Sequence, residues 1–172
     1  MRKPAAILGS FVFLLLAPGV VMGWVPWRIS HWQMQPPLLG FAGFRILGIL
    51  LVVIGVPMLL DSFARFAIQG LGTPAPVLPT KHLVVTGLYR YVRNPMYAGG
   101  TALVLGQALL LGDVRVLGYA LAVWSLSCLF VLGYEEPTLR KTFGAEYSAF
   151  CKNVPRWIPR PTPWKSQPDK DT

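Results

Sequence analysis

Four long apolar segments constrain the fold of this chain more than any other feature. They cover residues 5–27, 38–60, 96–112 and 114–134 and contain very few charged side chains. At about 1.5 Å of rise per residue, helices of this length reach about 25–34 Å, close to the thickness of the hydrocarbon core of a bilayer. The pattern predicts an all-α integral membrane protein with about four transmembrane helices.

The supply of charged residues supports this interpretation. Only 13% of the 172 residues are charged, while 53% are hydrophobic. Soluble domains carry about 25% charged residues, so this chain has too few to cover a water-facing surface. The same apolar content excludes intrinsic disorder of the whole chain. We expect a single transmembrane domain over residues 1–160 and a basic, proline-rich, disordered tail over residues 161–172.

The first apolar segment has a second interpretation. A short basic start, here Arg2 and Lys3, followed by an apolar run also describes a cleaved signal peptide. This segment is long, however, and it ends in Trp24, Pro26 and Trp27 rather than in a small-residue cleavage site. Paired tryptophans are typical of the membrane interface. A retained helix is therefore favoured over a cleaved signal.

The basic residues predict an orientation in the membrane. If the N-terminus is cytoplasmic and the helices alternate in direction, every Lys and Arg except Arg28, Arg45 and Arg115 falls on the cytoplasmic side. This bias follows the positive-inside rule and predicts a multi-pass protein with both termini in the cytoplasm. Most of the net charge of +9 then reflects topology. We therefore expect the lipid bilayer as a partner and no nucleic acid, and we predict no particular oligomeric state.

The third and fourth apolar segments are predicted to form a helical hairpin. They are separated by Gly112 and Asp113, two residue types that favour turns. The hairpin returns the chain to its starting side, so residues 93–95 and the Glu135–Glu136 pair reach the same cytoplasmic face. Residues distant in the sequence can then form one site.

The longest connection between apolar segments, residues 61–94, leads to this face. The second helix is expected to continue to about Ile68, before a stretch rich in glycine and proline. Residues 83–86 are predicted to be a short extended segment, which Gly87 ends. Connections of this length are usually functional or disordered, and the apolar and aromatic residues here favour order.

Asn94 and Pro95 are predicted to begin the third helix. Asn is a favoured N-cap residue and Pro suits the first helical position, so a purely structural interpretation is sufficient. The N-terminus of a helix also attracts anions through its free N–H groups. Aromatic and cationic residues gather here beyond what capping requires, which favours a binding site. These residues are Tyr89, Tyr91, Arg93 and Tyr97.

Glu135 and Glu136 are predicted to end the fourth helix, because Pro137 follows them directly. Two acids at a helix C-terminus oppose its dipole at a cost of about 0.3–1 kcal/mol each. The placement indicates a cationic partner, which is either an arginine of the chain in a structural ion pair or a bound ligand. The candidate arginines are Arg90, Arg93 and Arg140.

Beyond Pro137 the sequence predicts a C-terminal amphipathic helix. Its apolar residues recur at helical spacing, at Leu139, Phe143, Tyr147 and Phe150. Such a helix is expected to lie at the membrane interface. It is equally expected to pack on the cytoplasmic loops, and both arrangements can hold together.

Several chemistries are not supported by the sequence. The two histidines, His31 and His82, fall on opposite sides of the predicted topology, so no histidine dyad or metal site is expected. The two cysteines, Cys128 and Cys151, form no CxxC motif. There is also no GxGxxG motif after a strand and no Walker loop.

Two stretches of the chain resemble the isoprenylcysteine carboxyl methyltransferase and phospholipid methyltransferase superfamily. Residues 83–97 resemble its segment that binds S-adenosylmethionine, with the family pattern Arg, His or Asn, Pro, any residue, Tyr at Arg93-Asn94-Pro95-Met96-Tyr97. The resemblance covers roughly residues 40–160. Its second stretch contains Glu135-Glu136, Leu139, Phe143-Gly144, Tyr147, Val154-Pro155 and Pro159.

This resemblance implies a membrane-embedded methyltransferase that uses S-adenosylmethionine to methylate a lipophilic or small acceptor. By the same resemblance, the catalytic residues are Glu135, Arg93 and Tyr97. The residues that the resemblance places along the cofactor are Lys81, His82, Leu83, Val84, Tyr89, Asn94, Pro95, Met96, Tyr97 and Glu135.

One departure from the family pattern bears on the acceptor. The prenylcysteine enzymes carry an arginine one helical turn before the glutamate pair, where this chain has Val131. Without that cation a prenylcysteine carboxylate is less favoured as the methyl acceptor, and a lipid amine, a thiol or a phenol-like acceptor is more favoured. The alternatives to a methyltransferase are an NADPH-dependent enzyme of the sterol-reductase type and a non-enzymatic membrane scaffold.

Overall fold

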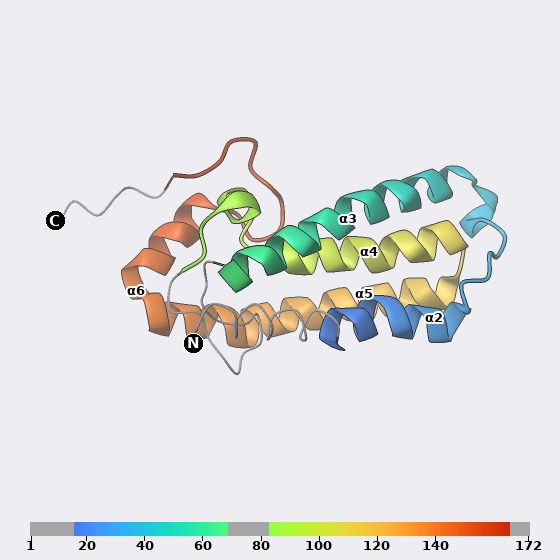
Figure 1. The fold of residues 1–172 in the computed structure, drawn as a ribbon, viewed down its shortest axis with the longest axis horizontal. Helices are drawn as coiled ribbons and strands as arrows, with labels where there is room; N and C mark the ends of the chain where they lie inside the picture. Colours follow the sequence, from blue (N-terminus) through green and yellow to red (C-terminus); the bar gives the residue numbers. More distant parts are fainter. Residues whose placement is uncertain (1–15, 69–82, 166–172) are drawn as a thin grey trace.

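The computed structural model describes residues 16–68 and 83–165. Within these ranges the chain consists of helices joined by turns and irregular segments, with no β-strand (Figure 1). The α-helices are α2 (Val25–Ser30), α3 (Gly43–Ile68), α4 (Pro95–Leu111), α5 (Val114–Phe130) and α6 (Glu136–Asn153). Single turns of 3-10 helix occur at Leu38–Gly40 and Gly87–Arg90, and turns of π-helix at Gly19–Trp24 and Val131–Glu135. The predicted all-α fold class is confirmed.

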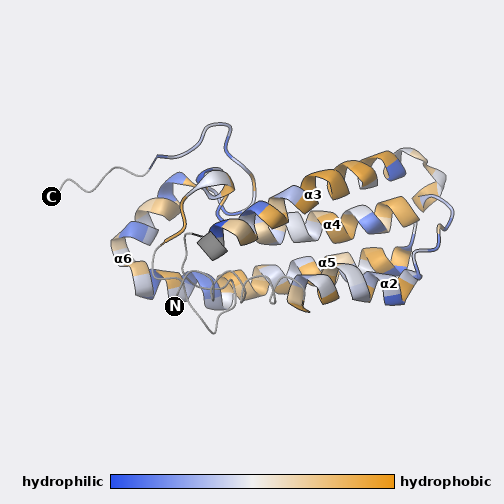
Figure 2. Ribbon diagram, viewed as in Figure 1, coloured by the Kyte–Doolittle hydropathy of each residue, from blue (hydrophilic) through white to orange (hydrophobic). Residues whose placement is uncertain are grey.

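Two of these helices are long and apolar enough to cross a membrane. They are residues 43–65 of α3 and the helix over residues 114–153, which is formed by α5, a π-helical turn and α6. Helix α4 is also apolar but has 17 residues. Figure 2 shows apolar residues concentrated along α3, α4 and α5, and polar residues in α6 and the loops. The count of about four transmembrane helices stays a prediction.

The predicted start of α3 is wrong by about one turn. The helix ends at Ile68 as predicted, but it begins at Gly43 rather than near residue 38. Residues 38–40 instead form a 3-10 turn in which Leu39 has a φ of 51°. A left-handed backbone conformation at this position cannot continue a right-handed helix.

Close packing of α3 on α4 depends on glycines of both helices. A Cβ added at Gly55 would lie 2.7 Å from the carbonyl oxygen of Gly99, and one added at Gly106 would lie 2.7 Å from that of Gly48. Small residues let two helix backbones approach in this way. On its other side α4 packs against α5 through fully or almost fully buried residues. These are Val104, Ala108, Val116 and Ala120.

The turn between α4 and α5 lies at Gly112 and Asp113, and the two helices run beside each other from it (Figure 1). Gly112 has a φ of 71°, which glycine adopts without strain. The side chain of Asp113 caps α5, because its Oδ1 accepts a hydrogen bond of 2.8 Å from the backbone N–H of Arg115. Hydrogen bonding from the Arg115 side chain lowers the pKa of Asp113.

Replacing Asp113 with alanine is expected to lower the thermal unfolding midpoint in detergent by a few degrees. The loss of an N-cap costs about 1 kcal/mol. Asp113→Asn, which keeps a capping oxygen, should retain most of the stability at pH 7. Because the pKa of Asp113 is lowered by folding, its contribution is present at neutral pH and is lost as the pH falls through that pKa. An alanine variant that unfolds at the wild-type temperature would show that the cap is unimportant.

Helix α6 packs its apolar face on the loop that precedes α4. Tyr147, Phe150 and Val154 are buried together, and Leu83 and Trp164 pack against them. The interpretation of this segment as a helix packed on the loops is supported, while its placement at a membrane interface stays a prediction. The sequence assigned residues 161–165 to the tail. In the structure the backbone N–H of Trp164 donates to the carbonyl of Arg90 at 2.9 Å, which attaches this segment to the loop before α4. The rest of the predicted tail lies outside the described residues.

Candidate functional site

The start of α4 is built as predicted except for its cap. Pro95 occupies the first turn and Asn94 precedes it, but the Asn94 side chain makes no capping hydrogen bond. Its Nδ2 instead donates to the carbonyl oxygen of Arg156 at 3.2 Å. Asn94 therefore occupies the predicted N-cap position, but the predicted capping hydrogen bond from its side chain is not made.

Tyr97 and Glu135 meet at the same end of the helices. The Tyr97 hydroxyl, in the first turn of α4, donates a hydrogen bond of 2.7 Å to Oε2 of Glu135. Glu135 is the last residue of the π-helical turn after α5, so the α4–α5 connection brings together two residues 38 positions apart. The ring of Phe130 lies beside Tyr97, with 6.5 Å between the ring centroids.

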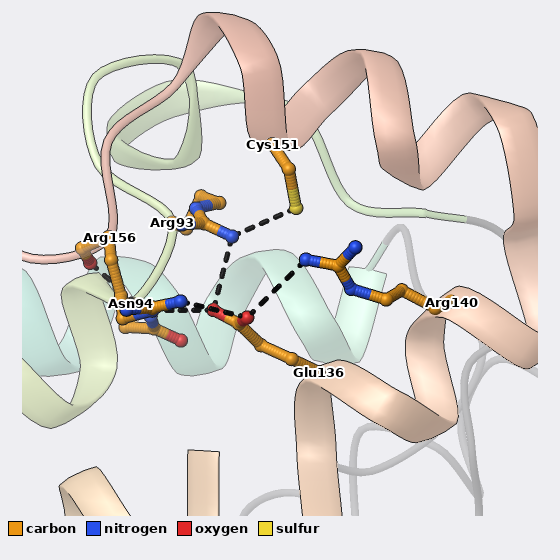
Figure 3. Close-up of polar contacts among 6 residues, drawn as sticks. All are labelled: Arg93, Asn94, Glu136, Arg140, Cys151 and Arg156. Carbon is orange, nitrogen blue, oxygen red and sulfur yellow. Dashed lines mark hydrogen bonds and ion pairs between the residues drawn. The ribbon is translucent and has the colours of Figure 1, made fainter. Parts of the chain in front are cut away.

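Glu136 makes a separate set of contacts with arginines. Figure 3 shows its carboxylate among Arg93, Arg140 and Arg156. Arg156 donates two hydrogen bonds to it, of 2.7 Å and 3.0 Å, and Arg93 donates one of 3.1 Å. Arg140 is more distant, at 3.9 Å. Hydrogen bonding to Glu136 raises the pKa of the Arg156 guanidinium.

The prediction that the glutamate pair ends a helix is wrong. The chain stays helical through a π-helical turn into α6, where Pro137 sits in the first turn and Glu136 is the first residue. At a helix N-terminus Pro is tolerated and the dipole favours an acid. A π-helical turn inserts an extra residue, and such turns often occur at functional sites. Glu135 contacts Tyr97 while Glu136 contacts the arginines.

The Arg93 side chain is part of this arginine–glutamate cluster. Its Nη1 donates both to Glu136 and to Sγ of Cys151, at 3.1 Å and 2.8 Å, and its side chain is 10% exposed. Of the three arginines that the sequence offered as partners for the acids, Arg93 and Arg140 pair with Glu136, whereas Arg90 donates to the carbonyl of Trp164. Arg156 was missed, because no local pattern links it to a residue 20 positions earlier.

The segment before α4 is anchored by buried side chains. Tyr89 is 6% exposed and hydrogen-bonds to Ser62 of α3, and burial raises the pKa of its hydroxyl. Val84 is also buried. Gly87 has a φ of 52°, a backbone conformation that favours glycine, and the Arg65 guanidinium lies against it. The predicted site residues Lys81 and His82 lie outside the described residues.

An apolar cavity of about 390 Å³ lies against Tyr97. Its size is in the range of small-molecule sites. It is lined from four parts of the chain, because α3, α4, α5 and the segment before α2 all contribute side chains. Sequence reasoning identified Met96 and Tyr97 but missed the others. The further lining residues include Met22, Leu59, Phe63, Val123 and Phe130.

No group of three or more His, Cys, Asp or Glu residues suited to a metal ion occurs in residues 16–68 and 83–165. The polar residues that line the cavity are Tyr97, Thr101 and Ser127. Glu135 does not line it but accepts the hydrogen bond from the Tyr97 hydroxyl. A helical bundle of this apolarity, with two helices long enough to cross a bilayer, is typical of a membrane protein, and the cavity beside Tyr97 is its candidate small-molecule site. Residues 44–146 match the phospholipid methyltransferase family, and the chain belongs to this family. The resemblance found in the sequence is confirmed.

Named relatives come from two kinds of methyltransferase. A protein-S-isoprenylcysteine O-methyltransferase of Schizosaccharomyces pombe is 40% identical over 80 residues, which are 45% of this chain and 34% of that protein. A phosphatidylethanolamine N-methyltransferase of Laccaria bicolor is 34% identical over 130 residues, which are 73% of this chain and 13% of that protein. The aligned parts thus span well under half of the length of these relatives.

Proposed function

We propose that this chain is a membrane-embedded methyltransferase that uses S-adenosylmethionine to methylate a lipophilic acceptor. The observation that carries the proposal is the hydrogen bond between Tyr97 and Glu135 at the edge of the apolar cavity. Membership of the phospholipid methyltransferase family supports it. So do the names of the relatives, which are an O-methyltransferase and an N-methyltransferase.

Tyr97, its partner Glu135 and the aromatic lining of the cavity fit this cofactor. S-adenosylmethionine supplies a methyl group on a positively charged sulfur. Glu135 offers a carboxylate for a positive charge or for hydroxyl groups, and Tyr97 fixes its direction. The aromatic rings of Phe63 and Phe130 line the same cavity and suit a planar base. In the proposed site these groups hold the cofactor together with Asn94, Pro95 and Met96.

We assign different roles to the three residues that the family pattern marks as catalytic. Tyr97 lines the cavity and Glu135 accepts its hydrogen bond, and both are proposed to contact the cofactor or the acceptor. Arg93 is turned toward Glu136 and Cys151, so we assign it to holding the loop before α4. Methyl transfer needs alignment of two reactants more than acid–base chemistry, and a preorganised site supplies that alignment.

The cavity also favours a particular kind of acceptor. Its lining is mainly apolar, which suits an acyl or prenyl chain. Val131, in the place of the arginine of the prenylcysteine enzymes, is completely buried and carries no charge for an acceptor carboxylate. The arginines near the site pair with Glu136. An acceptor with an amine, thiol or phenol group therefore fits better than a prenylcysteine carboxylate.

The same proposal includes the topology predicted from the sequence. Residues 1–160 form one domain with about four transmembrane helices, and α4 and α5 cross the bilayer as a hairpin. Both termini and the site lie on the cytoplasmic side, and α6 lies along the interface. The lengths of α3 and of the helix over residues 114–153 support this arrangement, as does the two-residue turn at Gly112 and Asp113.

Calorimetry in detergent tests the cofactor. The protein is expected to bind S-adenosylhomocysteine saturably, and binding of NADPH instead would favour the reductase alternative. Tyr97→Phe should weaken S-adenosylhomocysteine binding by about tenfold or more, because a hydrogen bond to a charged group contributes about 1.5–3 kcal/mol. The control is Thr142→Val, which removes an exposed hydroxyl on α6 that donates to the carbonyl of Thr138, and it should bind normally. Wild-type protein that binds neither ligand would favour the scaffold alternative.

A further inference from the structure

Arg156 contacts the candidate site in two independent ways. Its guanidinium forms two hydrogen bonds to Glu136, from Nε to Oε1 at 2.7 Å and from Nη2 to Oε2 at 3.0 Å. Its backbone carbonyl accepts the hydrogen bond from Asn94 Nδ2 at 3.2 Å. The two-point geometry with a carboxylate is the arrangement in which arginine is most specific. Arg156 lies outside residues 44–146, which match the family.

The segment that carries Arg156 follows the loop before α4 along most of its length. The N–H of Arg93 donates to the carbonyl of Pro155 at 2.9 Å, and the N–H of Arg160 donates to that of Tyr91 at 3.0 Å. The N–H of Trp164 donates to the carbonyl of Arg90 at 2.9 Å. Residues 155–164 thus supply hydrogen-bond partners to residues 90–94, immediately before Met96 and Tyr97.

Glu136, the first residue of α6, links both segments to this helix through Arg93 and Arg156. Its side chain is 7% exposed, and the side chains of Arg93 and Arg156 are 10% and 34% exposed. A carboxylate this deeply buried needs paired charges, and Arg93 and Arg156 provide them from two different segments. Neither Glu136 nor Arg156 lines the apolar cavity.

We propose that Arg156 and Glu136 are positioning residues that fix the loop of residues 90–94, and through it Asn94 and the start of α4, for cofactor binding. The proposal rests on the proposed methyltransferase function. Both residues act through Arg93 and Asn94, so their loss displaces the cofactor-binding loop. The expected consequence is a rise in KM for S-adenosylmethionine with little change in kcat at saturating cofactor.

The test uses substitutions that keep charge but alter geometry. Arg156→Lys retains the positive charge and loses the two-point contact, and Glu136→Asp retains the carboxylate and shortens its reach. Each is expected to weaken S-adenosylhomocysteine binding about tenfold and to raise KM for S-adenosylmethionine by a similar factor, with kcat within about twofold. Glu136→Gln should weaken binding more than Glu136→Asp. The matched control is Arg28→Lys, an exposed arginine on α2 at the opposite end of the helices.

The unfolding temperature distinguishes positioning from a general structural role. If Arg156→Lys lowers the unfolding temperature while the folded protein keeps wild-type affinity and KM, the proposal is overturned. Wild-type values of affinity, KM and unfolding temperature in both conservative variants would overturn it too. If wild-type protein does not bind S-adenosylhomocysteine, the proposed function fails, and this inference fails with it. If the wild-type protein binds S-adenosylhomocysteine and the variants bind it equally well, only this inference fails.

Discussion

Gly48→Val is expected to prevent the native packing of α3 against α4. A Cβ at this position would lie 2.6 Å from the backbone nitrogen of Leu110 and 2.7 Å from the carbonyl oxygen of Gly106. Both obstacles are backbone atoms, so no side-chain rotation relieves the clash, and valine adds two further carbons. Overpacking in a core costs about 1–3 kcal/mol and sometimes more, and we expect about 3 kcal/mol or more here. The variant should be recovered in low yield or unfold well below the wild-type temperature in detergent.

The control for this substitution is Gly118→Val in α5. A Cβ at Gly118 meets no atom within 4 Å, so the same change in side chain and helix propensity occurs without a clash. It should fold and unfold like the wild type to within a few degrees. A Gly48 variant with the same yield and unfolding temperature as the Gly118 variant would show that close α3–α4 contact does not stabilise the fold.

Glu135→Gln is expected to reduce kcat/KM for methyl transfer about 100-fold. Glutamine keeps the shape of the side chain but removes the negative charge that accepts the Tyr97 hydrogen bond at 2.7 Å. A charge-assisted hydrogen bond is about twice as strong as a neutral one, and a carboxylate facing a positively charged cofactor adds attraction. A loss of about 2.7 kcal/mol corresponds to 100-fold in rate. The measurement is transfer of a radiolabelled methyl group to membrane lipid extract and to small thiols.

Glu146→Gln provides the matched control, because Glu146 is exposed on α6. This variant loses the same charge and should keep the wild-type rate. Both variants should unfold near the wild-type temperature, since Glu135 is not among the acids that pair with arginine. Full activity of Glu135→Gln would show that Glu135 is not part of the site. Equal losses of activity in both variants would indicate an effect of net charge.

Much of the architecture could be predicted because it depends on local sequence. Helix type follows from the length and composition of the apolar segments, and the ends of α4 follow from Pro95 and Gly112. The proximity of Tyr97 and Glu135 could also be anticipated, because two helices of similar length joined by a short turn bring their far ends together. These inferences require only periodicity and turn chemistry.

The side-chain directions at the site could not be predicted in this way. Adjacent glutamates look equivalent in the sequence, yet Glu135 contacts Tyr97 and Glu136 contacts arginines. Adjacent residues of a helix point in different directions, and their partners come from segments far away in the sequence. Asn94 was expected to cap α4 but donates to the carbonyl of Arg156, 62 positions away. A local rule gives no information about a partner at that distance.

The sequence by itself determined the helical fold class, the family and the end of the helices where the polar residues gather. Apolar length and scarce charge are enough for the fold class, because the hydrophobic effect and backbone hydrogen bonding act on each segment separately. The family follows instead from the resemblance of residues 83–97 and 135–159. Only the tertiary structure decided which acid bonds to Tyr97, which arginines hold the loop, and that residues 155–164 support the start of α4. These contacts depend on the packing of segments far apart in the chain, where the geometry of many side chains is fixed together.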